Sequence, residues 1–232
     1  MNSLTSRPEW KLHWQMSSAE KLALQAILER LRPELSLEVG TYQGGSLQVI
    51  SHYSRKVISV DIDPEVASRL RPRFPGVDFR TGNSSTLLAT LVAELNGAGR
   101  QPDFVLIDAD HSTEAVRRDI HAILGLKVTK PMVVLMHDSY NPDCRAGILS
   151  ADWQGCPQVA AVEVDLVQGI FHAKAHDTAV AGSMWGGFAC ALLGPESRTQ
   201  PLVINQGHQS LFDAIYPRSS HRPRSRFFRW WR

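Results

Sequence analysis

Residues 35–46, LSLEVGTYQGGS, place a short apolar run directly before a glycine-rich turn. The run 35–39 is short and largely apolar and is ended by Gly40, which is consistent with a buried strand. The glycines permit a tight turn and a close approach of a ligand to the backbone. We expect the next helix to begin near Ser46, so that strand, turn and helix form one unit.

The same unit recurs toward the C-terminus. Helical patterns open at Pro64 and cover residues 85–95 and 113–124. They separate four further apolar runs, VISVD (57–61), VDFRTG (77–82), DFVLID (103–108) and MVVLMHD (132–138). Runs at 159–167 and 185–194 follow without a helix between them, so we expect an antiparallel pair at one sheet edge. The pattern predicts an α/β fold, a doubly wound and mostly parallel sheet of seven strands.

Toward the N-terminus, residues 18–31 follow a helical period, with Ser17 or Ser18 as the N-cap and Pro33 as the stop. A chain of 232 residues is long enough for one domain or two small ones. We therefore expect a single domain over 1–216, with a helical segment at 1–33 and the core sheet at 34–194. Residues 217–232 are expected to form a basic, aromatic tail.

Composition excludes several classes of protein. The hydrophobic share of 43% and charged share of 21% are those of a globular protein. No apolar run is long enough to span a membrane, and the first residues lack the apolar core of a secretory signal. Three scattered cysteines are too few for a disulfide framework or a CxxC zinc site. These features predict a cytoplasmic protein.

The formal net charge of +2 conceals an uneven distribution. Six of the 25 basic residues are arginines that follow the last acidic residue, Asp213, which leaves 19 basic against 23 acidic residues before them. The tail ends in SRFFRWWR, a mixture of arginine and aromatic residues suited to an anionic membrane surface. The alternatives are a solvated tail and, in a homo-oligomer, a tail that docks on a partner subunit.

Carboxylates at two strand ends favour a particular ligand. The glycine turn matches neither GxGxxG nor GxxxxGK[ST], and by itself it is equally typical of a plain strand-to-helix turn. Asp61, however, ends the second strand, where a carboxylate can accept both ribose hydroxyls of an adenosine. Glu38 suits a ligand that carries an ammonium group. Adenosine joined to an amino acid is S-adenosylmethionine.

The ordered motifs E-V-G-x-x-x-G-x-S, V-D-I-D-P, D-F-V-L-I-D-A-D-H-S and V-L-M-H-D-S cover residues 38 to 139. Over residues 18–194 the chain resembles class I S-adenosylmethionine-dependent methyltransferases. It is most similar to small bacterial O-methyltransferases of the cephalosporin-biosynthesis, macrolide sugar and catechol group. The resemblance implies a Rossmann-like methyltransferase fold. It also implies a set of cofactor contacts: Glu38, Gly40, Tyr42, Gly44 and Ser46 to the methionine part, Asp61 to the ribose, Asn83 and Ser84 to the adenine, and Asp108 nearby.

The fourth and fifth strand ends indicate a metal site. Neighbouring parallel strands bring Asp108 and Asp138 together, and carboxylate oxygens suit Mg²⁺. In metal-dependent relatives an acid stands where this chain has His137 and an asparagine where it has Ser139. We predict Asp108, His137 and Asp138 as ligands of Mg²⁺ or another divalent cation, with a hydrogen-bonded core histidine as the alternative for His137.

The predicted activity is O-methylation of a hydroxyl on a small molecule, such as a sugar, a phenol or a secondary metabolite. His111 is the first candidate for the catalytic base and His137 the second. The loops at 139–158 and 168–186 are expected to line the acceptor pocket. Two alternatives are a nucleic-acid methyltransferase that uses the arginine-rich tail and a non-catalytic binding module. We do not expect a nucleic-acid partner, because the body of the chain is acidic and lacks the N/D-P-P-Y/F motif.

Overall fold

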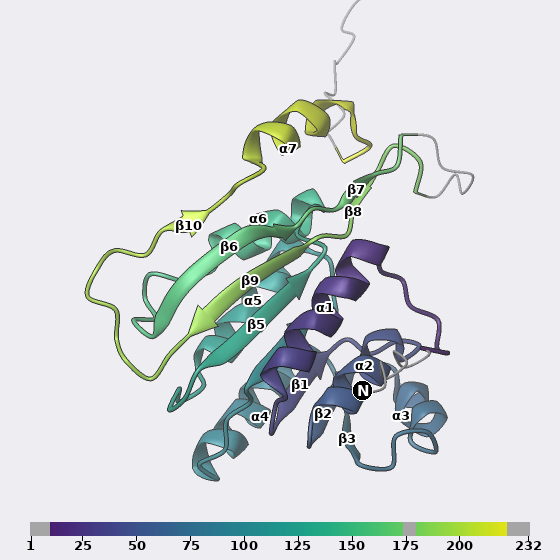
Figure 1. The fold of residues 1–232 in the computed structure, drawn as a ribbon, viewed down its shortest axis with the longest axis vertical. Helices are drawn as coiled ribbons and strands as arrows, with labels where there is room; N and C mark the ends of the chain where they lie inside the picture. The colour runs from purple at the N-terminus through teal and green to yellow at the C-terminus, as the bar shows by residue number, and fades with distance from the viewer. Residues whose placement is uncertain (1–9, 174–179, 222–232) are drawn as a thin grey trace, which may run out of the picture.

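The computed structural model describes residues 10–173 and 180–221, which form one large sheet between two layers of helices (Figure 1). The strand order is β3-β2-β1-β4-β5-β9-β6-β10. Only β9 runs antiparallel to its neighbours, β5 and β6. The strands of this sheet are β1 (Ser36–Val39), β2 (Val57–Asp61), β3 (Val77–Thr81), β4 (Phe104–Ile107), β5 (Met132–His137), β6 (Val159–Val167), β9 (Phe188–Leu193) and β10 (Ile204–Asn205).

The seven predicted strands are confirmed, and the sheet has one more. The short strand β10 pairs in parallel with β6 and takes the outer edge, so the antiparallel pair of β6 and β9 lies one strand in from the edge where it was predicted. Two residues carry too little periodicity to be recognised in the sequence. A separate hairpin of β7 (Ile170–Phe171) and β8 (Met184–Trp185) rises beyond the ends of β6 and β9.

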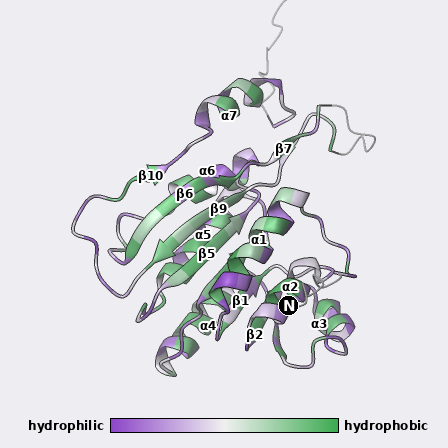
Figure 2. Ribbon diagram, viewed as in Figure 1, coloured by the Kyte–Doolittle hydropathy of each residue, from purple (hydrophilic) through white to green (hydrophobic). Residues whose placement is uncertain are grey.

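Helices cover both faces of the sheet because successive residues in a strand point to opposite sides. The helices α1 (Ser18–Leu31), α2 (Gly45–Tyr53) and α3 (Pro64–Leu70) pack over Phe104 and Leu106. On the other face, α4 (Ser84–Gly97), α5 (Thr113–Leu124) and α6 (Pro142–Ser150) pack over Val105 and Ile107. Figure 2 shows hydrophobic colour concentrated in the strands, in agreement with burial on both faces.

The N-terminal segment before α1 is tied to α2. The side chain of Gln48 accepts the Leu12 N–H at 3.0 Å and donates to the Leu12 carbonyl at 3.2 Å. A Cβ on Gly45 would lie 2.5 Å from the His13 carbonyl oxygen, so only glycine permits this crossing. Ser17 and Glu20 then form a capping box that starts α1. These contacts hold residues 13–17 at the carboxyl end of β1.

The C-terminal part is held by a buried ion pair. Arg145 of α6 contacts both oxygens of Asp165 at 2.7 and 3.1 Å and also donates to Gln209 at 2.9 Å. Gln209 begins α7 (Gln209–Ile215), which is followed by the 3₁₀ turn η1 (Tyr216–Arg218). Ser220 donates its N–H to the Gly182 carbonyl at 2.6 Å, so residues 217–220 continue along the hairpin.

Residues 222–232, which carry most of the predicted tail, lie outside the described residues, so their membrane role stays a prediction. Within the described ranges, no helix has the length and apolar character that crossing a bilayer requires.

Candidate active site

The site lies where the carboxyl ends of β1, β4 and β5 meet, at the point where the strand order reverses. A cavity of about 730 Å³ opens there. It is bounded by the N-terminal segment, the turn after β1, the ends of β4 and β5, and the β7–β8 hairpin. Side chains from segments more than 150 residues apart in sequence therefore face one space.

The turn after β1 requires unusual backbone conformations. Gly40 has φ +90°, and a Cβ there would lie 2.0 Å from the Asp108 carbonyl oxygen. The turn therefore passes directly over the end of β4. Tyr42 has φ +49° and an exposed side chain, while Gly44, with φ +82°, is the N-cap of α2. The conformation brings Gly40 and Ser46 to the cavity wall and leaves Gly44 behind it.

Asp61, at the end of β2, connects this turn to β2 by hydrogen bonds. Its Oδ2 accepts the backbone N–H groups of Thr41 and Tyr42, both at 2.9 Å, and its Oδ1 accepts that of Asp63 at 2.9 Å. A carboxylate that receives three N–H groups is held in one orientation. The residue predicted to bind ribose thus also shapes the turn over which a cofactor would lie.

Glu38 is fully buried beneath the same turn. Its two oxygens accept the hydroxyls of Ser46 at 2.6 Å and Thr41 at 2.9 Å. Burial raises the pKa of this carboxyl to about 8, despite the two hydroxyl donors, and the charges of Asp108 and Asp61 add to the rise. Glu38 therefore does not line the cavity, although Ser46, which it orients, does.

We expect Glu38→Gln to stabilise the folded protein at alkaline pH. A folded-state pKa of about 8 against an ordinary value of 4.5 means that the native protein keeps a proton that the unfolded chain loses. This carboxyl therefore lowers stability as the pH rises between those values, by an amount on the order of a few kcal/mol. Glutamine cannot ionise, and the hydroxyls of Ser46 and Thr41 can rotate to meet an amide.

Thermal unfolding of both proteins at about pH 5 and about pH 9 measures this effect. The two midpoints should be similar at the lower pH, and that of the variant should be several degrees higher at the upper pH. All other titrating groups are shared, so the difference isolates Glu38. Equal midpoints at both pH values would show that this carboxyl ionises freely in the folded protein.

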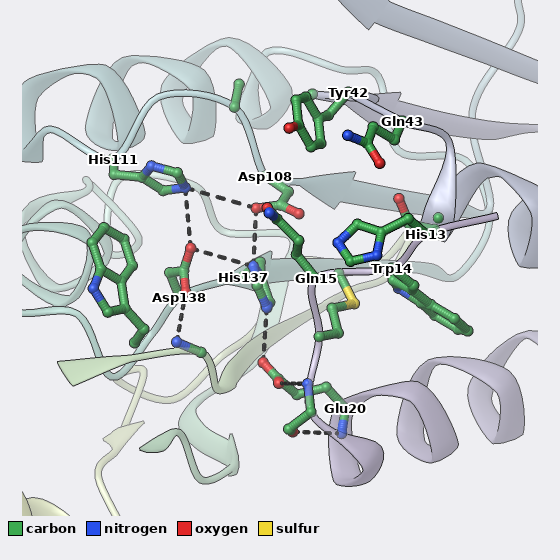
Figure 3. A pocket seen from close by; sticks show the side chains of 18 of the residues that line it. His13, Trp14, Gln15, Glu20, Tyr42, Gln43, Asp108, His111, His137 and Asp138 are labelled. Atoms are coloured by element: carbon green, nitrogen blue, oxygen red, sulfur yellow. Dashed lines mark hydrogen bonds and ion pairs between the residues drawn. The ribbon is translucent and has the colours of Figure 1, made fainter. Parts of the chain in front are cut away.

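The ends of β4 and β5 bring together two carboxylates and two imidazoles (Figure 3). The register pairs Ile107 with Met136, so Asp108 and His137 leave the sheet side by side. His137 Nδ1 lies 2.9 Å from Asp108 Oδ1 and 3.3 Å from Asp138 Oδ2. His111 Nε2 lies 3.0 Å from the same Asp138 oxygen. One ligand atom from each of Asp108, His137 and Asp138 falls within 4.8 Å of the others.

Two consecutive glycines donate to one carboxylate of this cluster, Asp138, and to a carboxylate beside it, Glu20. Gly186 and Gly187 follow β8 with φ +76° and +85°, a region that favours glycine. The Gly186 N–H is donated to Asp138 Oδ1 at 2.6 Å, and the Gly187 N–H to Glu20 Oε1 at 2.7 Å. Asp138 is thereby left with Oδ2 facing His111 and His137.

Charge pairing governs ionisation in the cluster. Burial opposes the charged form of His137, yet the charges and hydrogen bonds of Asp108 and Asp138 raise its pKa well above the ordinary value. Burial likewise acts to raise the pKa of Asp138, but His137 and His111 hold it far below its usual range. The hydrogen bond to Asp138 raises the pKa of His111 against the opposing effect of burial. With Glu20, which also contacts His137, three carboxylates face two imidazoles in this part of the cavity.

The predicted site residues fall into two groups. Those that line the cavity are Gly40, Tyr42, Ser46, Asp108, His111, His137 and Asp138. Those outside its lining are Glu38, Gly44, Asp61, Asn83 and Ser84. Asn83 is the N-cap of α4, where its side chain accepts from Ser85 N at 2.9 Å. Its predicted contact with the adenine stays a prediction.

Sequence reasoning missed the N-terminal contribution. His13, Gln15 and Met16 line the cavity, and Glu20 reaches its base. Glu20 Oε1 lies 2.8 Å from His137 Nε2, although 117 residues separate the two in the chain. The capping-box spacing of Ser17 and Glu20 marks a helix start, but nothing in it indicates a long-range partner.

Comparison with known proteins agrees with this arrangement. Residues 37–140 match a family model described as a methyltransferase domain. Over this stretch, just under half of its length, the chain is similar to methyltransferase domains. The match spans the turn after β1 and both strand ends that carry the cluster, which confirms the family resemblance of the motifs. The narrower O-methyltransferase subgroup stays a prediction. No curated protein matches this chain in sequence.

Solved structures share the fold. An O-methyltransferase from Bacillus cereus, in complex with SAH, has a TM-score of 0.54 and 15% identity, over 77% of this chain and 82% of that one. TomG of Streptomyces achromogenes, an O-methyltransferase involved in tomaymycin synthesis and in complex with SAM, has a TM-score of 0.52 and 16% identity, over 78% and 82%. A cofactor-bound protein from MTB has a TM-score of 0.56 and 20% identity, over 81% and 85%.

Of the two loops predicted to line the acceptor pocket, 139–158 and 168–186, the second contributes more to the cavity. Trp185 and His172 of the hairpin region line the cavity, and the Trp185 ring meets His111 edge-on at 5.3 Å. Tyr140 and Trp153 are buried in the hydrophobic core instead. His176 lies outside the described residues. The hairpin, more than the loop at 139–158, therefore forms the wall opposite the turn after β1.

Proposed function

We propose that this methyltransferase moves the methyl group of S-adenosylmethionine to a hydroxyl of a small molecule, with the help of a divalent cation. The supporting observation is the charge of one shared cavity. Glu20, Asp108 and Asp138 line it together with the turn after β1, whereas its described lining residues include neither lysine nor arginine. Such a surface suits a sulfonium, an ammonium and a metal ion, and it is unfavourable for a phosphate-bearing ligand.

The cofactor part of the proposal rests on the turn and on Asp61. Gly40 and Ser46 bring backbone and hydroxyl groups to the cavity wall. The Asp61 carboxylate stands at the end of the neighbouring strand, where it would hold the ribose. Two of the structural neighbours named above are complexes with SAH or SAM, which supports the same cofactor here.

The metal part rests on the donor set of Asp108, His137 and Asp138. Two carboxylates and an imidazole, close together and open to a cavity, are ligands that divalent cations accept. Such a cation, when bound, would orient the acceptor hydroxyl and lower its pKa. His111 is half-exposed beside the cluster, and its Nε2 faces the same Asp138 oxygen that a cation would use. A bound cation would compete for that oxygen, and His111 Nε2 would then be able to give up its proton and receive that of the hydroxyl.

A small acceptor is the favoured class. The cavity volume of about 730 Å³ lies within the range of roughly 300–1,000 Å³ that is usual for small-molecule sites. Ile170 and Trp185 offer apolar and aromatic surface, and His172 offers a hydrogen-bonding group. This combination fits a hydroxyl on a ring, as in a phenol or a sugar.

Mass spectrometry of the purified full chain under native conditions tests the cofactor assignment. We expect bound S-adenosylmethionine or S-adenosylhomocysteine, and calorimetric binding of added S-adenosylhomocysteine to protein stripped of ligand. Transfer of a labelled methyl group to a panel of phenols and sugars tests the reaction itself. A folded protein that binds neither compound would overturn the proposal in favour of a non-catalytic module.

Removal of the metal should suppress the reaction selectively. We expect protein treated exhaustively with EDTA to lose nearly all transfer of the labelled methyl group and to recover it when Mg²⁺ or Mn²⁺ is added. Its affinity for S-adenosylhomocysteine should persist, because Asp61 and the turn after β1 do not belong to the donor set. Undiminished rates after chelation would place the enzyme among metal-independent methyltransferases and contradict the metal part alone.

A further inference from the structure

Glu20 is a buried carboxylate at the base of the active-site cavity. Its side chain is 2% exposed and extends from the first turn of α1. Oε2 accepts the Ser17 N–H at 2.6 Å, and Oε1 accepts the Gly187 N–H at 2.7 Å. Oε1 also lies 2.8 Å from His137 Nε2 (Figure 3). A carboxylate withdrawn from water is costly unless it is paired in this way, so these contacts fix its position.

Glu20 determines which nitrogen of His137 faces the other carboxylates. An imidazole ring has two distinct nitrogens, and a hydrogen bond to one fixes the role of the other. With Nε2 against Glu20, Nδ1 points between Asp108 and Asp138, at 2.9 and 3.3 Å. A 180° rotation of the ring about its bond to Cβ would break the contacts of Nδ1 with Asp108 and Asp138 and the contact of Nε2 with Glu20. Phe188 also packs against the ring, with 5.3 Å between centroids.

We propose that Glu20 is a positioning residue for the divalent-cation site. By accepting the Nε2–H of His137, it presents Nδ1 of that ring to a cation held jointly with Asp108 and Asp138. This inference rests on the metal part of the proposed function. Histidines that bind metals usually donate their second ring N–H to a carboxylate or carbonyl, and loss of that partner costs about 10–100-fold in metal affinity or activity.

The competing explanation is a purely structural role, in which Glu20 only anchors α1 to the sheet. Two control variants separate the roles. Leu24→Ala, at a fully buried position of the same helix, loosens the apolar packing of α1 and leaves the Glu20 side chain unchanged. Glu29→Gln makes the same chemical change as Glu20→Gln at an exposed position of α1.

The experiment measures Mn²⁺ affinity of the metal-free full chain by electron paramagnetic resonance of the unbound ion. We expect Glu20→Gln to bind Mn²⁺ about 10-fold or more weakly than the unaltered protein. Leu24→Ala should retain the affinity despite a lower unfolding midpoint, and Glu29→Gln should match the unaltered protein in both respects. A folded Glu20→Gln variant with undiminished affinity, or an equal loss in Leu24→Ala, would overturn the positioning role.

These outcomes are distinct from a failure of the proposed function. If the unaltered protein itself binds no Mn²⁺, the metal part is overturned and the role of Glu20 falls with it. If the unaltered protein binds Mn²⁺ and Glu20→Gln binds it equally well, the metal part stands and only the role of Glu20 is rejected.

A second measurement uses only the unaltered protein, so its result does not depend on whether a variant folds. Nitrogen-15 resonance of labelled histidine in the unaltered protein reports each ring nitrogen of His137 as Zn²⁺ is added. We expect Nε2 to keep its proton, held by Glu20, while the resonance of Nδ1 moves to that of a metal ligand. Loss of the Nε2 proton when Zn²⁺ binds would show that Nε2, and not Nδ1, is the metal ligand. That result would overturn the proposal.

Discussion

Asp138→Asn is expected to reduce methyl transfer by at least about 100-fold, to abolish binding of the divalent cation, and to leave cofactor binding intact. Asp138 directs Oδ2 toward both His111 and His137, at 3.0 and 3.3 Å. In the variant an amide nitrogen can occupy that place, and an amide nitrogen does not bind metal ions as a carboxylate oxygen does. The substitution also removes one negative charge from the proposed metal site.

Asparagine is a better replacement than alanine because of the backbone. Asp138 has φ +56°, in the left-handed region that asparagine and aspartate tolerate better than other non-glycine residues. Its Oδ1 also accepts the Gly186 N–H at 2.6 Å, a bond that the amide oxygen of asparagine can keep. An alanine would add backbone strain and lose this bond, which would mix loss of stability with loss of function.

Three measurements check the result: rates of labelled methyl transfer, Mn²⁺ affinity, and calorimetric binding of S-adenosylhomocysteine. Asp143→Asn is the matched control, an exposed position in the first turn of α6, five residues further along the chain. We expect the control to behave as the unaltered protein. Normal Mn²⁺ affinity in Asp138→Asn would remove Asp138 from the proposed ligands.

The second large effect is expected in Asp61→Ala, which should weaken binding of S-adenosylhomocysteine by about 100-fold. The substitution removes the proposed acceptor of the ribose hydroxyls, and hydrogen bonds to charged groups contribute about 1.5–3 kcal/mol each. It also releases the N–H groups of Thr41 and Tyr42, which hold the turn after β1 in place. Both losses weaken the binding of the cofactor. The contacts of His137 with Asp108 and Asp138 do not involve Asp61.

Two companion variants separate these contributions. Asp61→Asn can keep the bonds to Thr41 and Tyr42 through its amide oxygen but lacks the charge, so we expect an intermediate loss of affinity. Asp63→Ala removes only the N-cap of α3, where Oδ1 accepts from Glu65 N at 2.9 Å, and should reduce stability but not affinity. Calorimetric titration measures all three variants. An unchanged dissociation constant in Asp61→Ala would refute the cofactor assignment of this residue.

Much of the fold could be predicted because its signals are local. The helices at 18–31 and 113–124 have the predicted bounds, since Ser17 and Ser112 cap their starts through neighbouring N–H groups. The juxtaposition of Asp108 with the end of β5 was also predictable. Adjacent parallel strands end at the same edge, and the observed register of β4 with β5 confirms that they do.

Other features depend on long-range packing. The edge strand β10 has only two residues and exists because β6 offers an unpaired edge. Glu20 carries the sequence signature of a capping box, yet it meets His137 only because α1 packs across the sheet. The N–H groups of Gly186 and Gly187 reach the carboxylates of Asp138 and Glu20 because distant segments of the chain pack together there.

The sequence by itself determined the succession of the seven predicted strands and of the helices between the first five, the turn after β1, and the carboxylates at the strand ends. Apolar periodicity, caps and glycine positions act over a few residues and can be recognised in one chain. Only the tertiary structure decided that Glu38 lies beneath Ser46, outside the cavity, and that α1 supplies the carboxylate that orients His137. Hydrogen-bond partners of buried charges are selected by the packing of distant segments, and no local pattern records that choice.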